Sequence, residues 1–184
     1  LALLYLSFYA SFGFYHLLPQ AIAFLLMFLT TAAAAALALH YNSQAVSILG
    51  LLGGYLTPAL LATGENRMWT LAGYTFVLNA GAVAIARIKP WPALTYLGWA
   101  ATWALFLGWS SDWLTNETRG PAFAWLVISY MLFLLVSAES RNVMLLALNS
   151  GVYFTVSYYL LDPQYHAWLG GFALALALLH GGLA

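Results

Sequence analysis

The stretch QAIAFLLMFLTTAAAAALAL, residues 20–39, decides the class of fold. It is a continuous apolar run without a charged residue. A helix that crosses the hydrocarbon core of a bilayer needs about 20 mostly apolar residues, and this run has that length. A strand of a membrane β-barrel is shorter and alternates apolar with polar residues. The run therefore predicts a transmembrane α-helix.

Turn residues and charges divide the rest of the chain into similar runs. These lie near 1–15, 45–62, 68–86, 92–109, 121–138, 143–161 and 167–184. The breaks between them carry nearly all of the charged residues and most of the prolines, and the short connections favour antiparallel neighbours. We expect an all-α fold, a polytopic transmembrane helical bundle of about eight spans arranged as consecutive antiparallel hairpins, in a single domain over residues 1–184.

Composition supports the same class and excludes others. The chain is 64% hydrophobic and 5% charged, whereas soluble domains carry about 25% charged residues. The formal net charge is zero, so we expect no nucleic-acid partner, because nothing would neutralise a row of phosphates. Cysteine is absent, which excludes disulfides and thiolate metal sites. We expect no metal site, the lipid bilayer as the surrounding partner, and other membrane protein subunits as further candidate partners.

The charges in the loops predict an orientation. Side A of the predicted bundle has the loops near 40–44, 87–91 and 139–142. It carries the basic residues Arg87, Lys89 and Arg141, and the opposite side carries Arg67 and Arg119. Lys and Arg in short loops favour the cytoplasmic side, so we expect side A and both ends of the sequence to be cytoplasmic. The chain begins without Met and ends within an apolar run, and we expect it to be part of a longer multi-pass protein.

Two apolar runs contain the same pattern, Leu-Asn-small-Gly, at 78–81 and 148–151. A buried amide is costly unless it finds a hydrogen-bond partner. Counting 1.5 Å per residue along oppositely directed helices puts Asn79 and Asn149 at one depth, about 10 Å below side A. We expect both to point into the bundle. They could form interhelical hydrogen bonds, to each other or to a backbone carbonyl, or they could line a polar cavity for a substrate.

The run at 45–62 has a second unusual feature. Gly50 and Gly54 form a G-x-x-x-G pair, and Pro58 follows four residues later. This pattern is typical of a close helix crossing with a proline kink, and Thr57 could satisfy the freed backbone groups. The alternative is a broken helix whose freed carbonyls bind an ion or a substrate.

No carboxylate, Lys or Arg lies well inside a predicted span, although proton- and ion-coupled carriers usually keep such a group in the membrane. His180, with glycines beside it, and His40, after an alanine-rich helix, are candidate axial ligands of a haem or chlorophyll-type pigment. Hydrogen-bonded packing is the alternative for both, and we expect no cofactor. The chain has no P-loop, no H-E-x-x-H and no G-x-S-x-G, so it has no catalytic candidate and is not expected to be an enzyme.

Four segments carry a family resemblance. They are Tyr5–Tyr9, FYHLLP at 14–19, YNSQA at 41–45 and LGLLGGYLTPALL at 49–61. Over this first third the chain resembles a large bacterial family of multi-pass predicted membrane proteins, domain of unknown function 2339. The resemblance implies long chains of consecutive hairpins in the bacterial inner (cytoplasmic) membrane. It implies no reaction, cofactor or catalytic residue.

Three functions are consistent with these features. The first is a structural or accessory component of a membrane complex, favoured by the absence of buried charge and by the small-residue packing. The second is a transporter or flippase for an uncharged or lipid-like substrate, favoured by the glycine–proline run and the two asparagines. The third is a tetrapyrrole-binding membrane subunit, favoured by the two histidines.

Overall fold

The chain folds into α-helices joined by short loops. The computed structural model describes residues 2–165, 171 and 173. Its helices are α1 (Ala2–Gly13), α2 (Gln20–His40), α3 (Gln44–Leu60), α4 (Met68–Ile88), α5 (Pro92–Trp113), α6 (Arg119–Glu139) and α7 (Val143–Tyr165). The described residues contain no strand. The all-helical class is therefore confirmed, and the helix bounds lie close to the predicted runs.

The prediction of about eight spans is not confirmed. Four described helices are long and apolar enough to cross a membrane: Gln20–His40, Met68–Ile88, Arg119–Glu139 and Val143–Leu161. Helices α1 and α3 are apolar but shorter. The 12 residues of α1 extend only about 18 Å, less than the roughly 30 Å of a hydrocarbon core. The predicted eighth run, 167–184, lies almost entirely outside the described residues.

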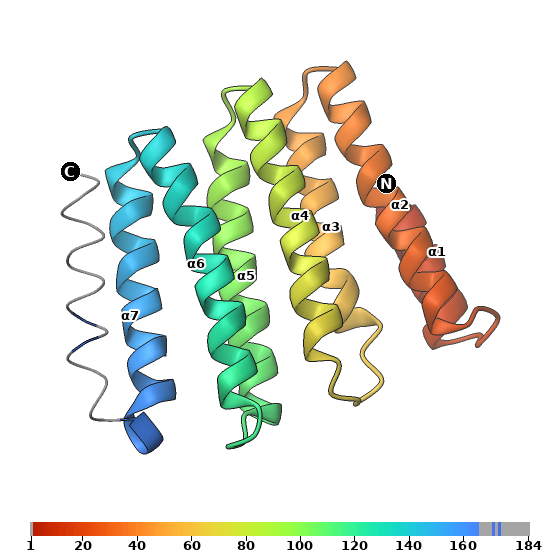
Figure 1. Ribbon diagram of the computed structural model, residues 1–184. Coiled ribbons are helices and arrows are strands. Elements are labelled where there is room, and N and C mark those ends of the chain that lie inside the picture. Colours follow the sequence, from red (N-terminus) through yellow and green to blue (C-terminus); the bar gives the residue numbers. More distant parts are fainter. Residues whose placement is uncertain (1, 166–170, 172, 174–184) are drawn as a thin grey trace. The chain divides into compact units, whose positions relative to one another are not determined.

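Two hairpin turns share one backbone conformation. Asn42 follows α2 and Arg141 follows α6, and both adopt positive φ, 49° and 50°. In each turn an N–H donates to the carbonyl five residues earlier at 2.9 Å, Ser43 to Ala38 and Asn142 to Ser137. This hydrogen bond is that of a Schellman motif, which satisfies carbonyls at a helix end. The sharp reversal lets α3 return along α2 and α7 return along α6 (Figure 1).

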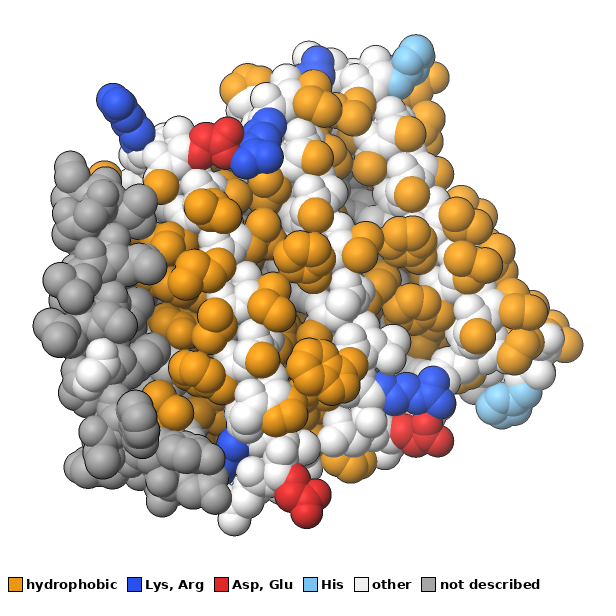
Figure 2. Space-filling model, in the orientation of Figure 1, with side chains coloured by type: hydrophobic (Ala, Val, Ile, Leu, Met, Phe, Trp, Pro, Cys, Tyr) orange, Lys and Arg blue, Asp and Glu red, His pale blue; other side chains and the backbone are white. Residues whose placement is uncertain are grey.

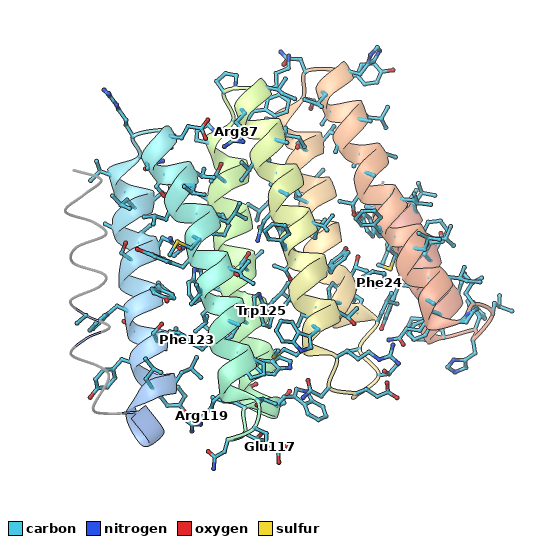
Figure 3. All side chains as sticks on the ribbon, in the orientation of Figure 1. Phe24, Arg87, Glu117, Arg119, Phe123 and Trp125 are labelled. Atoms are coloured by element: carbon cyan, nitrogen blue, oxygen red, sulfur yellow. The ribbon has the colours of Figure 1, made fainter. Side chains whose placement is uncertain are left out.

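The chain divides into two compact units, Leu1–Ser110 and Ser111–Ala184. In the first unit α2 and α3 pack closely, and α1 packs against both. The buried face of α2 is built mainly from small residues, and so is that of α3. The ring of Phe24 on α2 packs at 4.7 Å from the ring of Tyr74 on α4 (Figure 3 labels Phe24). One hydrophobic core links residues of α2, α3, α4 and the start of α5.

In the second unit α6 and α7 form a hairpin. The rings of Tyr130 on α6 and Tyr153 on α7 stack with centroids 4.1 Å apart. Arg119, labelled at the start of α6 in Figure 3, donates from Nη1 to the Leu160 carbonyl at 2.9 Å. A cation near the last turn of a helix is favourable because the carbonyls there carry partial negative charge. The open end of the hairpin is thus fastened by a charge-assisted bond.

Charged side chains lie at the helix ends of each unit, with hydrophobic side chains between them (Figure 2). The exposed large residues of the helices are mainly apolar, among them Leu25, Leu29, Leu49, Leu107 and Leu135. Such helix faces need a hydrocarbon environment, because a soluble monomer rarely exposes large contiguous apolar patches.

Candidate functional site

Asn79 joins three helices of the first unit. Its side chain is 2% exposed. The Tyr55 hydroxyl on α3 donates to Asn79 Oδ1 at 2.6 Å, and Asn79 Nδ2 donates to Thr102 Oγ1 on α5 at 2.7 Å. Thr102 Oγ1 in turn donates to the Gly98 carbonyl at 2.7 Å. The amide therefore connects α4 to both neighbours through hydrogen bonds within the protein.

The direction of this chain of hydrogen bonds is fixed. The single hydroxyl proton of Thr102 goes to a carbonyl that can only accept, so Thr102 Oγ1 must accept from Asn79 Nδ2. That assignment leaves Asn79 Oδ1 as the acceptor for Tyr55. The chain ends at a carbonyl and passes through a neutral amide, and neither group releases a proton at physiological pH. The arrangement suits helix packing and does not suit proton transfer.

The G-x-x-x-G pair on α3 lies at a close helix contact. A Cβ at Gly50 would lie 2.5 Å from Ala34 Cβ on α2, and a Cβ at Gly54 would lie 3.0 Å from Thr31 side-chain atoms. These separations leave no room for a side chain larger than hydrogen at Gly50 without movement of α2. Gly53, between the pair, is covered by the ring of Tyr5 from α1.

Pro58 lacks an N–H, so the carbonyl four residues earlier, that of Gly54, loses its helical donor. The Tyr74 hydroxyl on α4 donates to this carbonyl at 2.8 Å. The Thr57 hydroxyl donates to the neighbouring Gly53 carbonyl at 2.9 Å. The backbone group freed by the proline thus has a protein donor, and α3 continues as a helix to Leu60.

Tyr5 supplies a third hydroxyl to the same part of α3. Its oxygen lies 2.5 Å from Thr31 Oγ1 and 3.2 Å from the Gly50 carbonyl, to which it donates. Sequence reasoning missed Tyr5, Tyr55, Tyr74 and Thr102 as partners. A signal was present, because a tyrosine inside an apolar run needs a hydrogen-bond partner just as an asparagine does.

Asn149 is paired differently. Its side chain is fully buried, at 0% exposed, so neither asparagine lies on the outer surface. Asn149 Nδ2 donates to the Tyr130 carbonyl on α6 at 3.1 Å. Asn149 Oδ1 is also buried and has no hydrogen-bond partner among the described residues. Each asparagine finds its partners inside its own unit, and the common depth of the two stays a prediction.

The glycines of the two Leu-Asn-small-Gly patterns do not serve close contacts among the described residues. A Cβ at Gly81 or Gly151 would meet nothing within 4 Å. Of the two candidate axial ligands, His40 is exposed at the end of α2, and its ring packs edge-on against Tyr41 with centroids 4.9 Å apart. His180 lies outside the described residues. Among the described residues, no group of three or more His, Cys, Asp or Glu is placed to hold a metal ion.

Comparisons with known proteins address the family. No curated protein matches the chain, and no solved structure matches it. The model of one family, described as "Predicted membrane protein (DUF2339)", matches residues 1–184. The match extends the resemblance seen in the first third to the whole sequence, and it agrees with the apolar helices described above. The chain therefore belongs to the DUF2339 family of predicted membrane proteins.

Proposed function

We propose that the chain is a structural or accessory component of a membrane complex in the bacterial inner membrane. The observation that carries this proposal is the pairing of Asn79. Both polar ends of its amide are occupied by protein groups, Tyr55 and Thr102. The Gly54 carbonyl beside Pro58 likewise has Tyr74 as its donor. These groups of the first unit, which a substrate could otherwise bind, serve instead to hold helices together.

The absence of buried charge points the same way. Transporters that couple to protons or ions usually keep an ionisable side chain within the membrane, and this sequence has no Asp, Glu, Lys or Arg well inside an apolar run. The hydrogen-bond chain through Asn79 does not suit proton transfer either. Helices that are joined by internal hydrogen bonds and present apolar faces fit a protein whose task is to hold or position others.

The experiment is isolation of the protein from its native membrane within polymer-bounded lipid discs, followed by mass determination and identification of bound proteins. A fixed stoichiometry with one other membrane protein, lost in a Gly50→Leu variant and kept in a Gly151→Leu control, supports the proposal. Recovery of the wild-type chain without a stoichiometric partner contradicts it.

A second candidate is a flippase or transporter for an uncharged or lipid-like substrate. Asn149 Oδ1 favours it, because this buried acceptor has no protein donor among the described residues and a substrate group could supply one. The test is reconstitution in liposomes that contain a headgroup-labelled fluorescent phospholipid. An impermeant reductant outside the liposomes bleaches label from the inner leaflet only if the protein moves the lipid outward. Such bleaching supports transport if Asn149→Leu slows it while the stability of the protein stays normal. Bleaching at the level of protein-free liposomes counts against it. No described contact of His40 favours the tetrapyrrole alternative.

The orientation belongs to the same proposal. We expect side A and both ends of the sequence to face the cytoplasm. Because the chain lacks cysteine, Asn42→Cys and Thr115→Cys each introduce a single reactive thiol at an exposed position. An impermeant thiol reagent applied to intact cells should label the second variant and not the first. The opposite labelling reverses the orientation.

A further inference from the structure

The strongest unexplained feature of the described residues is the buried acceptor of Asn149. Its amide nitrogen is paired with the Tyr130 carbonyl at 3.1 Å, while Oδ1 has no partner in the described part of the chain. Rotating the amide by 180° does not pair both ends. Oδ1 would then face the Tyr130 carbonyl oxygen, which cannot donate, and Nδ2 would lose its acceptor. Buried polar groups in native proteins are almost always paired, with protein, ordered water or a bound molecule.

The backbone donors and two serine hydroxyls of the hairpin are already in use. The backbone N–H groups within α6 and α7 serve their own helices. The Ser150 hydroxyl, next to Asn149 in the chain, donates to the Leu146 carbonyl at 2.8 Å. The Ser137 hydroxyl donates to the Phe133 carbonyl. A serine has a single hydroxyl proton, so neither serine is free to donate to Asn149.

Asn79 shows what a completed site of the same pattern is like. There the oxygen accepts from a hydroxyl, that of Tyr55, at 2.6 Å. The surroundings of Asn149 are neutral and largely apolar, with Leu145, Tyr130 and Tyr153 buried close by in the hairpin. A cationic donor would lose its hydration there without gaining a counter-charge, which is strongly unfavourable. The missing donor should therefore be neutral, and the site of Asn79 shows that a hydroxyl suits such an acceptor.

We propose that Asn149 Oδ1 is the acceptor of a binding site for a neutral hydroxyl, supplied by a water molecule or by the hydroxyl of a lipid headgroup. The site goes beyond the structural role proposed above and does not depend on it. It assigns to Asn149 a ligand-binding role that Asn79, with both ends paired in the protein, does not have.

The test observes both asparagines in one sample without a substitution. Asn79 and Asn149 are the only asparagines that follow a leucine, and they precede Ala80 and Ser150 respectively. Labelling leucine with 13C at the carbonyl and asparagine with 13C and 15N therefore selects these two residues in solid-state NMR. The full chain is studied in bilayers of phosphatidylglycerol, which has headgroup hydroxyls, and of phosphatidylcholine, which has none.

The 13C chemical shift of the Asn149 side-chain carbonyl should be that of a hydrogen-bonded amide. If water is the donor, the shift is the same in both lipids and the carbon receives magnetisation from water protons. If a lipid hydroxyl is the donor, the hydrogen-bonded shift appears in phosphatidylglycerol and is lost in phosphatidylcholine. Asn79 should be hydrogen-bonded in both lipids without transfer from water. An unbonded shift for Asn149 in both lipids overturns the proposal, and so does a bonded shift in both without contact to water.

Discussion

Asn79 and Asn149 occupy the same sequence pattern, yet their amides are paired to different extents. On α4, Asn79 lies between a tyrosine of α3 and a threonine of α5, and both ends of its amide are bonded. On α7, Asn149 donates to a backbone carbonyl of α6, and its oxygen has no partner among the described residues. Both side chains are buried. The pattern therefore governs burial, while the residues on neighbouring helices govern pairing.

The same contrast applies to the glycines. Gly50 and Gly54, in the unit of Asn79, lie where α2 and α3 nearly touch, whereas a Cβ at Gly151, beside Asn149, would meet none of the described residues within 4 Å. Close approach between helices in a membrane depends on small residues. The first unit uses them on its inner surface, and the described part of the second unit relies on stacked tyrosines and on the Arg119 bond.

The largest effect is expected from Gly50→Leu. The first added carbon would already lie 2.5 Å from Ala34 Cβ, so α2 and α3 must separate and the Tyr5 contact with Gly50 is lost. We expect the free energy of unfolding to fall by about 3 kcal/mol, measured by denaturant titration in detergent micelles. The matched control is Gly151→Leu, expected to change stability by less than about 0.5 kcal/mol. Equal effects would remove the contrast between the two sets of glycines.

Asn79→Leu is expected to have the next largest effect. It leaves the buried Tyr55 hydroxyl without its acceptor and removes the donor to Thr102. Loss of one partner from a buried pair costs about 1–3 kcal/mol, and we expect about 2 kcal/mol from the same titration. A cost below about 0.5 kcal/mol would mean that the three-helix connection contributes little to stability.

Much of the fold follows from local signals in the sequence. Pro19 marks the start of α2, Ser43 accepts from the Val46 N–H at the start of α3, and charges mark most other ends. The number of spans does not follow in the same way, because an apolar run such as that of α3 forms a helix of 17 residues, shorter than the four candidate spans. Sequence marks where a helix begins and ends more clearly than whether it crosses the bilayer.

The partners of the candidate residues are less accessible to sequence reasoning. The freed carbonyl beside Pro58 was expected, with Thr57 as a donor, but the group that pairs with it is Tyr74, one helix further along the chain. Tyr55 reaches Asn79 across a separation of 24 residues. Such pairs depend on the rotation of each helix about its axis, which local sequence patterns do not fix. The requirement for a partner is predictable, and the identity of the partner is not.

Tyr55→Phe sharpens the comparison, because it leaves Asn79 with an oxygen that has no protein donor, the state of Asn149 among the described residues. The expected loss of stability is about 1 kcal/mol. Combining it with Asn79→Leu should cost less than the sum of the single changes, since the two residues share one hydrogen bond. Tyr41→Phe, at an exposed tyrosine, is the control and should be neutral. Additive costs would show that the 2.6 Å contact does not contribute to stability.

Asn149→Leu should have the smallest effect, although its side chain is the more deeply buried of the two asparagines. The change removes one bond, to the Tyr130 carbonyl, and interhelical hydrogen bonds of this kind in membranes average about 0.6 kcal/mol. It also removes an acceptor that has no protein partner among the described residues, so no protein donor is left unpaired. We therefore expect a loss of only about 0.6 kcal/mol in the same titration. The result separates pairing from burial as the origin of stability. A cost equal to that of Asn79→Leu would mean that a protein donor serves Asn149 after all, and the distinction between the two asparagines would then disappear.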